Sequence, residues 1–359
     1  MQKLLVLLFA ALLPVSLLRA QDQFSVKGKV IDAASKAPLA GASVFCQNTT
    51  FGVVTNAAGE FSLRLPNGGY DLVASFTGYQ SEQQRITGAA EDLVIELKTK
   101  DKSMESVAVV GSNEVPDGLA KYGAFFKEQF LGSTANAAAC SIVNPEVLRF
   151  FYSKKRNRLK VLAKEDLYIE NQALGYRIRY QLDSLSYEYG NAISTFSGFP
   201  FFEMMTGTAE QEAKWKQNRA TAYRGSKLHF MRSWYKKTIA EEGFALEKVI
   251  GEGKGFDATQ LPDYYDSSFY QLDSGTVVIN LTGKYRVVYR KELPDPKFVA
   301  YYKLPSHIRV QLSVVDILDE FLIESNGYWY EQSDIINNGY WSFEKMAEAV
   351  PYDYIPEPN

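Results

Sequence analysis

Four polar residues stand at helical spacing in one stretch of the chain and could do chemistry together. Arg219, Tyr223, Ser226 and His229 follow one another at intervals of four, three and three, which places them on one helix face. There Arg219 could bind an anion, and Ser226 and His229 could form a nucleophile and its base. The sequence shows no orienting carboxylate, oxyanion loop or nucleophile elbow beside them. We therefore favour a helix face packed on a sheet, and keep a hydrolase using the Arg219–His229 face as the alternative.

A second candidate site is aromatic. Tyr328-Trp329-Tyr330 and Tyr340-Trp341 concentrate large rings in two short runs. Exposed rings, Trp329 and Trp341 above all, could stack on a sugar or on a partner protein. Rings that face inward would belong to the core, and this interpretation is favoured because Trp and Tyr are mostly buried.

Several other chemistries lack the residues they need. A catalytic zinc site takes three protein ligands, commonly histidines, and the chain has only two histidines, His229 and His307. No Gly-rich phosphate loop and no calcium loop occurs. The formal net charge of -3 lacks the basic surplus of a nucleic-acid binder. We predict no metal, no cofactor and no nucleic-acid partner.

The elements that would position these residues indicate a β-rich α+β domain over residues 121–359. Glu210–Ala240 is the one long helical stretch, with a bend at Gly225. Alternating apolar residues predict a hairpin around the basic run 154–158 and a series of further strands. The predicted strands are 147–152, 159–163, 176–182, 196–202, 277–279, 285–289, 309–314 and 321–323.

Residues 1–20 read as a secretory signal peptide. Lys3 supplies the positive charge, Leu4–Leu18 the apolar region, and Ala20 a small residue at the cut. Pro14 interrupts the apolar region, which is also short for a membrane span. We expect a mature chain that starts at Gln21 and has no transmembrane span.

The two cysteines, Cys46 and Cys140, are expected to be free. Alternation in the run 42–46 puts Cys46 on the same face as Ala42 and Val44, which is the predicted core face. Cys140 falls in the other domain. Both are best explained as small buried hydrophobic residues.

Residues 21–98 form a separate unit of short strands. Alternating runs at 24–31, 42–46, 52–55, 60–65, 70–76 and 93–97 are separated by Gly, Pro and Asn. Strands at this spacing predict a β-sandwich. Residues 99–120 are polar around a Val-rich centre and are expected to be a linker or an added strand.

Within this unit, four stretches resemble the carboxypeptidase regulatory-like domain. They are Val26–Val30, Pro38–Val44, Gly59–Leu63 and Thr77-Gly78-Tyr79. The resemblance implies a transthyretin-like all-β sandwich and no activity, because the zinc ligands of metallocarboxypeptidases lie in a separate catalytic domain. Peptidase activity of that type is not expected here.

Two further resemblances concern location. The same module precedes the plug of TonB-dependent receptors, and Ser106–Gly111 resembles the receptor segment after it, although residues 121–359 are too few for a barrel. Stretches such as Phe130–Ser133, Cys140–Pro145 and Gly339–Trp341 resemble a family of exported bacterial proteins with an uncharacterised C-terminal domain. We expect a non-catalytic binding or assembly module of the Gram-negative envelope, in the periplasm or at the outer membrane, with an envelope protein or glycan as partner.

Overall fold

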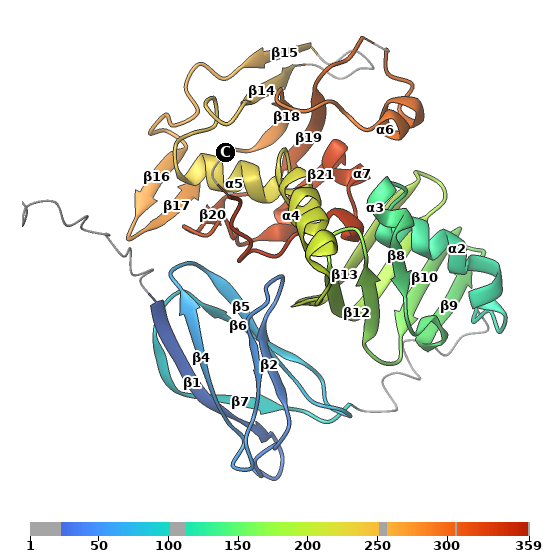
Figure 1. Cartoon of the computed structure of the whole chain (residues 1–359), viewed down its shortest axis with the longest axis vertical. Coiled ribbons are helices and arrows are strands. Elements are labelled where there is room, and N and C mark those ends of the chain that lie inside the picture. Colours follow the sequence, from blue (N-terminus) through green and yellow to red (C-terminus); the bar gives the residue numbers. More distant parts are fainter. Residues whose placement is uncertain (1–22, 101–112, 251–256, 306, 358–359) are drawn as a thin grey trace, which may run out of the picture.

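The computed structural model describes residues 23–100, 113–250, 257–305 and 307–357 (Figure 1). The predicted signal peptide and the Val-rich centre of the predicted linker lie outside these ranges. Strands dominate over helices in the described residues, so the predicted β-rich fold class is confirmed. Among the described residues, no helix has the length and apolar character needed to cross a membrane.

Residues 23–97 form the predicted β-sandwich. One sheet has the order β4-β1-β7 and the other the order β3-β2-β5-β6. The strand that prediction missed is β6, because only Ile86 is buried in an otherwise polar run. The bounds are β1 (Gln23–Asp32), β2 (Ser43–Cys46), β3 (Gly52–Val54), β4 (Glu60–Pro66), β5 (Tyr70–Ser75), β6 (Glu82–Ile86) and β7 (Ala90–Leu97).

Strand β2 shows how the sandwich meets the rest of the chain. Val44 and Cys46 face the sandwich core, as predicted from alternation. Phe45 faces the opposite way and is still fully buried, because its ring packs on Phe201 with centroids 5.3 Å apart. Both Cys46 and Cys140 are free and buried, which confirms the prediction for the thiols. The outer face of this sheet is therefore a docking surface within the molecule.

The second part is a six-stranded sheet, in which β13 pairs with β12 outside the main order β8-β11-β12-β10-β9. The predicted hairpin is confirmed as β9 and β10. Helix α2 (Gly118–Leu131), whose first turn is the end of the predicted linker, buries Phe126 and Phe130 in this core. The strands are β8 (Cys140–Ile142), β9 (Leu148–Ser153), β10 (Arg158–Ala163), β11 (Leu167–Asn171), β12 (Tyr176–Glu188) and β13 (Ile193–Met204), and α3 spans Ala135–Ala138.

The third part contains a five-stranded sheet, β15-β14-β18-β19-β21, and a three-stranded sheet, β16-β17-β20. Its strands are β14 (Phe244–Ile250), β15 (Asp257–Gln260), β16 (Tyr270–Asp273), β17 (Thr276–Ile279), β18 (Gly283–Tyr289), β19 (Gln311–Ile317), β20 (Phe321–Ile323) and β21 (Ile335–Gly339). The helices are α4 (Ala209–Tyr223), α5 (Lys227–Tyr235), α6 (Pro296–Tyr301) and α7 (Tyr340–Phe343). Figure 1 shows α4 beside the second part and α5 among the strands of the third part, whose core its buried residues join.

The predicted continuous helix over residues 210–240 is instead two helices. Thr208 caps α4 in a capping box with Gln211, and Ser226 caps α5. Between them, Gly225 has φ of +79°, a conformation that favours glycine. A Cβ at this position would lie 2.3 Å from Oε1 of Gln311. The chain therefore breaks where a bend was expected, and α5 takes a new direction.

Candidate functional site

Three of the four predicted polar residues, Tyr223, Ser226 and His229, lie together, but the four do not share one helix face. Arg219 and Tyr223 belong to α4, Ser226 is the N-cap of α5, and His229 lies in its first turn. The rings of Tyr223 and His229 have centroids 4.8 Å apart. Arg219, Tyr223 and His229 are all buried. The break at Gly225 thus brings His229 against Tyr223 and Ser226, while Arg219 contacts residues of the second part.

Both ring nitrogens of His229 have partners. Nδ1 accepts a hydrogen bond from the Gly225 amide at 3.2 Å, and Nε2 lies 3.2 Å from Oε2 of Glu242. The Ser226 hydroxyl accepts instead from the backbone amide of His229, at 3.2 Å. Burial lowers the pKa of His229, although the hydrogen bond and charge of Glu242 oppose the shift. A neutral imidazole with both nitrogens engaged has none left to activate Ser226.

Glu242 is the carboxylate that sequence reasoning did not find. It lies in the turn after α5, thirteen positions beyond His229. Nothing distinguishes it in the sequence, because Glu241 stands beside it and carboxylates are abundant. Only the return of the chain below α5 brings Glu242 to the ring.

Arg219 is also used within the protein. Its Nη1 donates to the carbonyl of Leu174 at 3.2 Å, and the guanidinium lies 5.3 Å from the ring centroid of Tyr176. The side chain is buried between α4 and the second sheet. In this position it stabilises the packing of α4 on the sheet.

The two tryptophans are buried as favoured, with exposed fractions of 5% for Trp329 and 6% for Trp341. Trp341 Nε1 donates to the carbonyl of Gly225 at 2.8 Å. Trp329 packs on Tyr352 with centroids 5.7 Å apart, and its buried Nε1 has no hydrogen-bond partner in the structure. Both residues line a cavity that no sequence pattern indicated.

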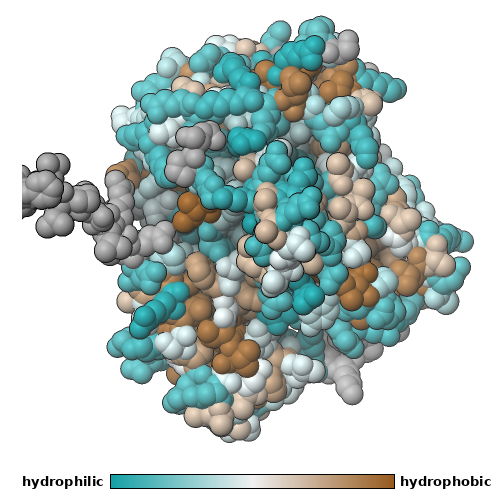
Figure 2. Space-filling model, viewed as in Figure 1, coloured by the Kyte–Doolittle hydropathy of each residue, from teal (hydrophilic) through white to brown (hydrophobic). Residues whose placement is uncertain are grey.

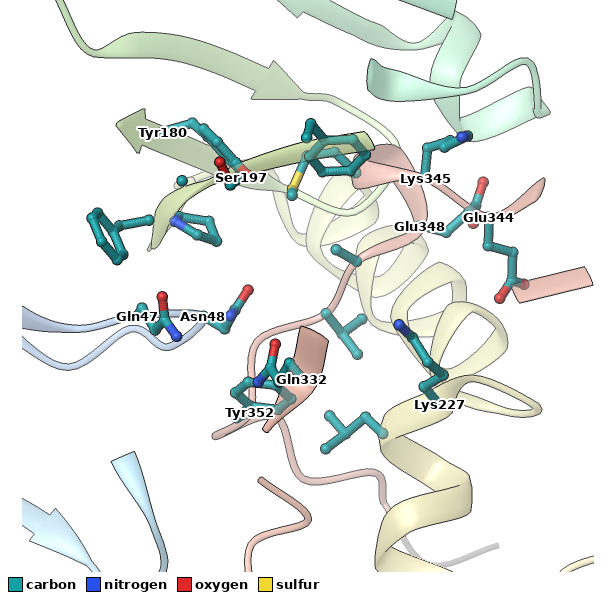
Figure 3. Close-up of a pocket in the computed structure, with 18 of the residues that line it drawn as sticks. Gln47, Asn48, Tyr180, Ser197, Lys227, Gln332, Glu344, Lys345, Glu348 and Tyr352 are labelled. Atoms are coloured by element: carbon teal, nitrogen blue, oxygen red, sulfur yellow. The ribbon is translucent and has the colours of Figure 1, made fainter. Parts of the chain in front are cut away.

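This cavity has a volume of about 780 Å³ and lies where the three parts of the molecule meet (Figure 3). The sandwich contributes Gln47 and Asn48, the second sheet contributes residues 196–200 of β13, and the third part contributes residues 226–228 with the segment 344–350. The volume falls in the range of ligand-binding clefts. Three of the predicted candidates, Ser226, Trp329 and Trp341, line it.

One end of the cavity is charged. Figure 3 shows Lys227, Glu344, Lys345 and Glu348 gathered there, with Gln47, Asn48 and Ser197 at the other end. Burial lowers the pKa of Lys227 to about 8, an effect that Glu344 opposes. Burial raises the pKa of Glu344 well above its usual range, and the charge of Glu348 adds to the rise. A half-buried amine and a half-buried carboxyl group thus face one space.

The amine of Lys227 makes no ion pair or hydrogen bond with the described residues. Nζ lies 5.4 Å from the ring centroid of Trp329, and the charge of Glu344 also favours the protonated amine. Glu348, in contrast, accepts hydrogen bonds from Thr134 and from Asn136, the latter at 2.7 Å. No sequence pattern indicated Lys227 or Glu344, because neither stands in a motif.

The shape of the cavity depends on the hydrogen bonds that hold the sandwich against the other two parts. The Asn48 amide donates to the carbonyl of Pro200 at 2.7 Å, and the Phe202 amide donates to the carbonyl of Thr49 at 3.0 Å. The Asn48 carbonyl accepts from the Tyr352 amide at 2.6 Å. A loop of the first part therefore bonds to a strand of the second and to the end of the third. This arrangement can present a ligand with side chains from all three.

Metal binding has no support in the geometry. Among the ranges that the structure describes, no group of three or more His, Cys, Asp or Glu side chains is placed to hold an ion. The cavity has a polar and aromatic lining, with one amine and one carboxyl group whose side chains make no hydrogen bond to the described residues.

Comparison with known proteins identifies the N-terminal part. Residues 26–109 match the family described as CarboxypepD_reg-like domain, so the chain carries this domain, in agreement with the resemblance of the motifs. Over 115 residues, which make up 32% of this chain, the sequence is 35% identical to the TonB-dependent receptor SusC of Bacteroides thetaiotaomicron. It spans only 11% of the receptor's length.

Two solved structures illustrate the structural likenesses. A DUF3823 family protein from Bacteroides ovatus aligns with 52% of this chain and 83% of its own, at 11% identity and a TM-score of 0.19. The 3-chlorocatechol 1,2-dioxygenase of Rhodococcus opacus aligns with 19% of this chain and 44% of its own, at 16% identity and a TM-score of 0.17.

Proposed function

We propose that this chain is an exported, non-catalytic module of the Gram-negative envelope that binds an envelope component in the three-part cavity. The observation that carries the proposal is the cavity itself, in which the side chains of Lys227 and Glu344 make no hydrogen bond to other described residues. Polar groups that line a cleft in this way are available to orient a ligand. The partner is an envelope protein or a glycan.

Location in the envelope, either periplasmic or at the outer membrane, rests on two supports. A stretch of 115 residues is 35% identical to part of SusC, a TonB-dependent receptor, and residues 1–20 have the pattern of a signal peptide. The face shown in Figure 2 is mostly hydrophilic, with hydrophobic side chains scattered in small groups. A hollow between the parts is thus a better candidate for specific binding than this face.

The hydrolase alternative receives no geometric support. It needs a free nitrogen on His229 toward Ser226, and both nitrogens are engaged by Gly225 and Glu242. In this proposal the residues from Arg219 to His229 stabilise the fold and take no part in catalysis.

Binding to an isolated envelope fraction tests the proposal. The full chain, labelled with a fluorophore, should bind the envelope fraction of the producing bacterium saturably. Ser197→Trp should abolish binding, because Ser197 is exposed and lines the cavity. Thr195→Trp is the matched control, since Thr195 is exposed on the same face of β13 and does not line the cavity. Equal binding by both variants would show that the cavity is not the site.

The domain boundaries belong to the same proposal. Residues 21–98 are the sandwich, 99–120 the linker and 121–359 the α+β domain. Limited proteolysis of the folded chain should cut between about 99 and 120 before it cuts inside the sandwich. Early cuts within the sandwich would contradict these boundaries.

A further inference from the structure

Strand β13 has one edge that is only partly covered. It pairs with a single strand, β12, along its whole length. In an antiparallel pair, residues that direct N–H and C=O toward the partner alternate with residues that direct them away. The carbonyl of Pro200 and the amide of Phe202 bond to the sandwich loop, so these two residues direct their groups away from β12.

The same alternation assigns the next residues of this edge. Gly198 and Phe196 follow Pro200 at steps of two, and their backbone groups also point away from β12. The register shift opposite them lies between Leu182 and Ser184 and places the extra residue in β12, so the alternation within β13 continues. Neither residue has a backbone partner on this side among the described residues.

The covered half and the free half of the edge are continuous. Thr49 of the sandwich forms an isolated parallel bridge with Phe201, which occupies the Pro200–Phe202 half. Phe196 and Gly198, on the other half, line the cavity. Proteins normally cover unpaired strand edges, since these edges are templates for further pairing. Here the unpaired edge of β13 at Phe196 and Gly198 faces the cavity instead.

We propose that the free edge of β13 at Phe196–Gly198 accepts an extended peptide segment of a partner protein as an added strand, next to the Asn48-Thr49 loop. This inference rests on the proposed function, and it names the class of ligand for the same cavity. Strand addition supplies affinity through main-chain hydrogen bonds and specificity through pockets for alternate side chains. The charged end at Lys227 and Glu344 would select a polar side chain of the peptide.

A glycan fits the cavity less well than a peptide. Sugars are bound largely by stacking on an open ring face, whereas the two indoles of the cavity, Trp329 and Trp341, expose only 5% and 6% of their surface. Backbone groups at a strand edge match the repeat of another backbone instead. The geometry therefore favours a polypeptide over a sugar chain.

Backbone-modified peptides test the proposal. A display library of random linear peptides is selected on the full chain, and binders that Ser197→Trp loses and Thr195→Trp keeps are synthesised with one N-methyl group at each position in turn. Methyl groups on alternate residues should weaken binding about tenfold, because each removes one main-chain donor, while those between should have little effect. Hydrogen exchange at the amides of Phe196 and Gly198 should slow when the peptide binds.

Three results would overturn this inference. They are a library that yields no peptide with this dependence on Ser197, N-methyl groups tolerated at every position, and unchanged exchange at Phe196. Treatment of the envelope fraction separates the failure of this inference from that of the proposed function. If binding survives protease but not periodate oxidation of sugars, and still requires the cavity, the ligand is a glycan, the proposed function stands and the peptide inference is wrong.

Discussion

Lys227 and His229 belong to the same turn of α5, and yet their surroundings differ completely. Burial lowers the pKa of both side chains. The imidazole of His229 is enclosed by its own chain, with Gly225 and Glu242 on its two nitrogens. The amine of Lys227 faces a cavity and has no bonded partner among the described residues. A shifted pKa alone therefore does not separate the two side chains, and what distinguishes Lys227 is its position beside a cavity.

The largest expected effect is on the free energy of unfolding, when the buried Arg219 is replaced. Arg219→Ala should lower the free energy of unfolding by about 4 kcal/mol, because it removes a buried side chain and leaves the carbonyl of Leu174 without its donor. Chemical denaturation measures the change. Lys214→Ala, at an exposed position of the same helix, should shift the free energy by less than about 0.5 kcal/mol. Equal effects of the two substitutions would contradict the structural role of Arg219.

His229→Ala should lower the free energy of unfolding by about 3 kcal/mol, because the ring packs on Tyr223, Phe244 and Tyr289. The exposed His307 provides the control, and His307→Ala should be nearly neutral. Envelope binding should fall only as folding falls. If His229→Ala melted like the wild type while losing a measured esterase, amidase or glycosidase activity, the hydrolase alternative would replace the binding module.

Lys227→Met should leave stability nearly unchanged and weaken binding, in contrast to the substitutions of Arg219 and His229. Removing a half-buried amine that has no ion partner should change the free energy of unfolding by less than about 1 kcal/mol, since the lost contact with Trp329 is offset by relief of desolvation. Envelope binding should nevertheless drop, whereas Lys248→Met, at an exposed position, should bind normally. A Lys227→Met protein that is strongly destabilised would place Lys227 with His229 as a structural group.

The smallest expected effect is a difference in pH dependence. The pKa of His229 is lower in the folded than in the unfolded chain, so the unfolded chain binds the extra proton below about pH 6.5. This contribution makes stability fall as the pH drops from 7 through that value. His229→Gln cannot take up the proton and should lose stability less steeply over this window. The raised pKa of Glu344 acts in the opposite direction, but it is common to both proteins.

Urea titrations of both proteins between about pH 7 and 5 give the comparison. Parallel curves would mean that His229 is protonated in the folded state as readily as in the unfolded one. The conclusion that His229 is a buried, neutral imidazole in the folded chain would then be incorrect.

The sandwich was predictable because its strands carry their own signal. Alternating residues such as Val44 and Cys46 point into one core that the same short segment completes. Strand β6 lacked this signal, because it is a mostly exposed strand with one buried residue. The break between α4 and α5 was foreseen only as a bend at Gly225. The structure shows a φ of +79° there, and a Cβ would meet the side chains of Gln311 and Tyr289, which lie far along the chain.

Local features could be predicted from the amino-acid sequence alone: the sandwich strands other than β6, the β-rich class, the free thiols and the resemblance to the regulatory-like domain. Each of these follows from residues close together in the chain, whose spacing decides which side chains are buried. The tertiary structure alone decided that Glu242 reaches His229, that Phe45 is buried against Phe201, and that Lys227 and Glu344 share a cavity. Two residues that come together from distant segments show no periodic pattern in the sequence at either position. Only the packing of the three parts reveals such a pair.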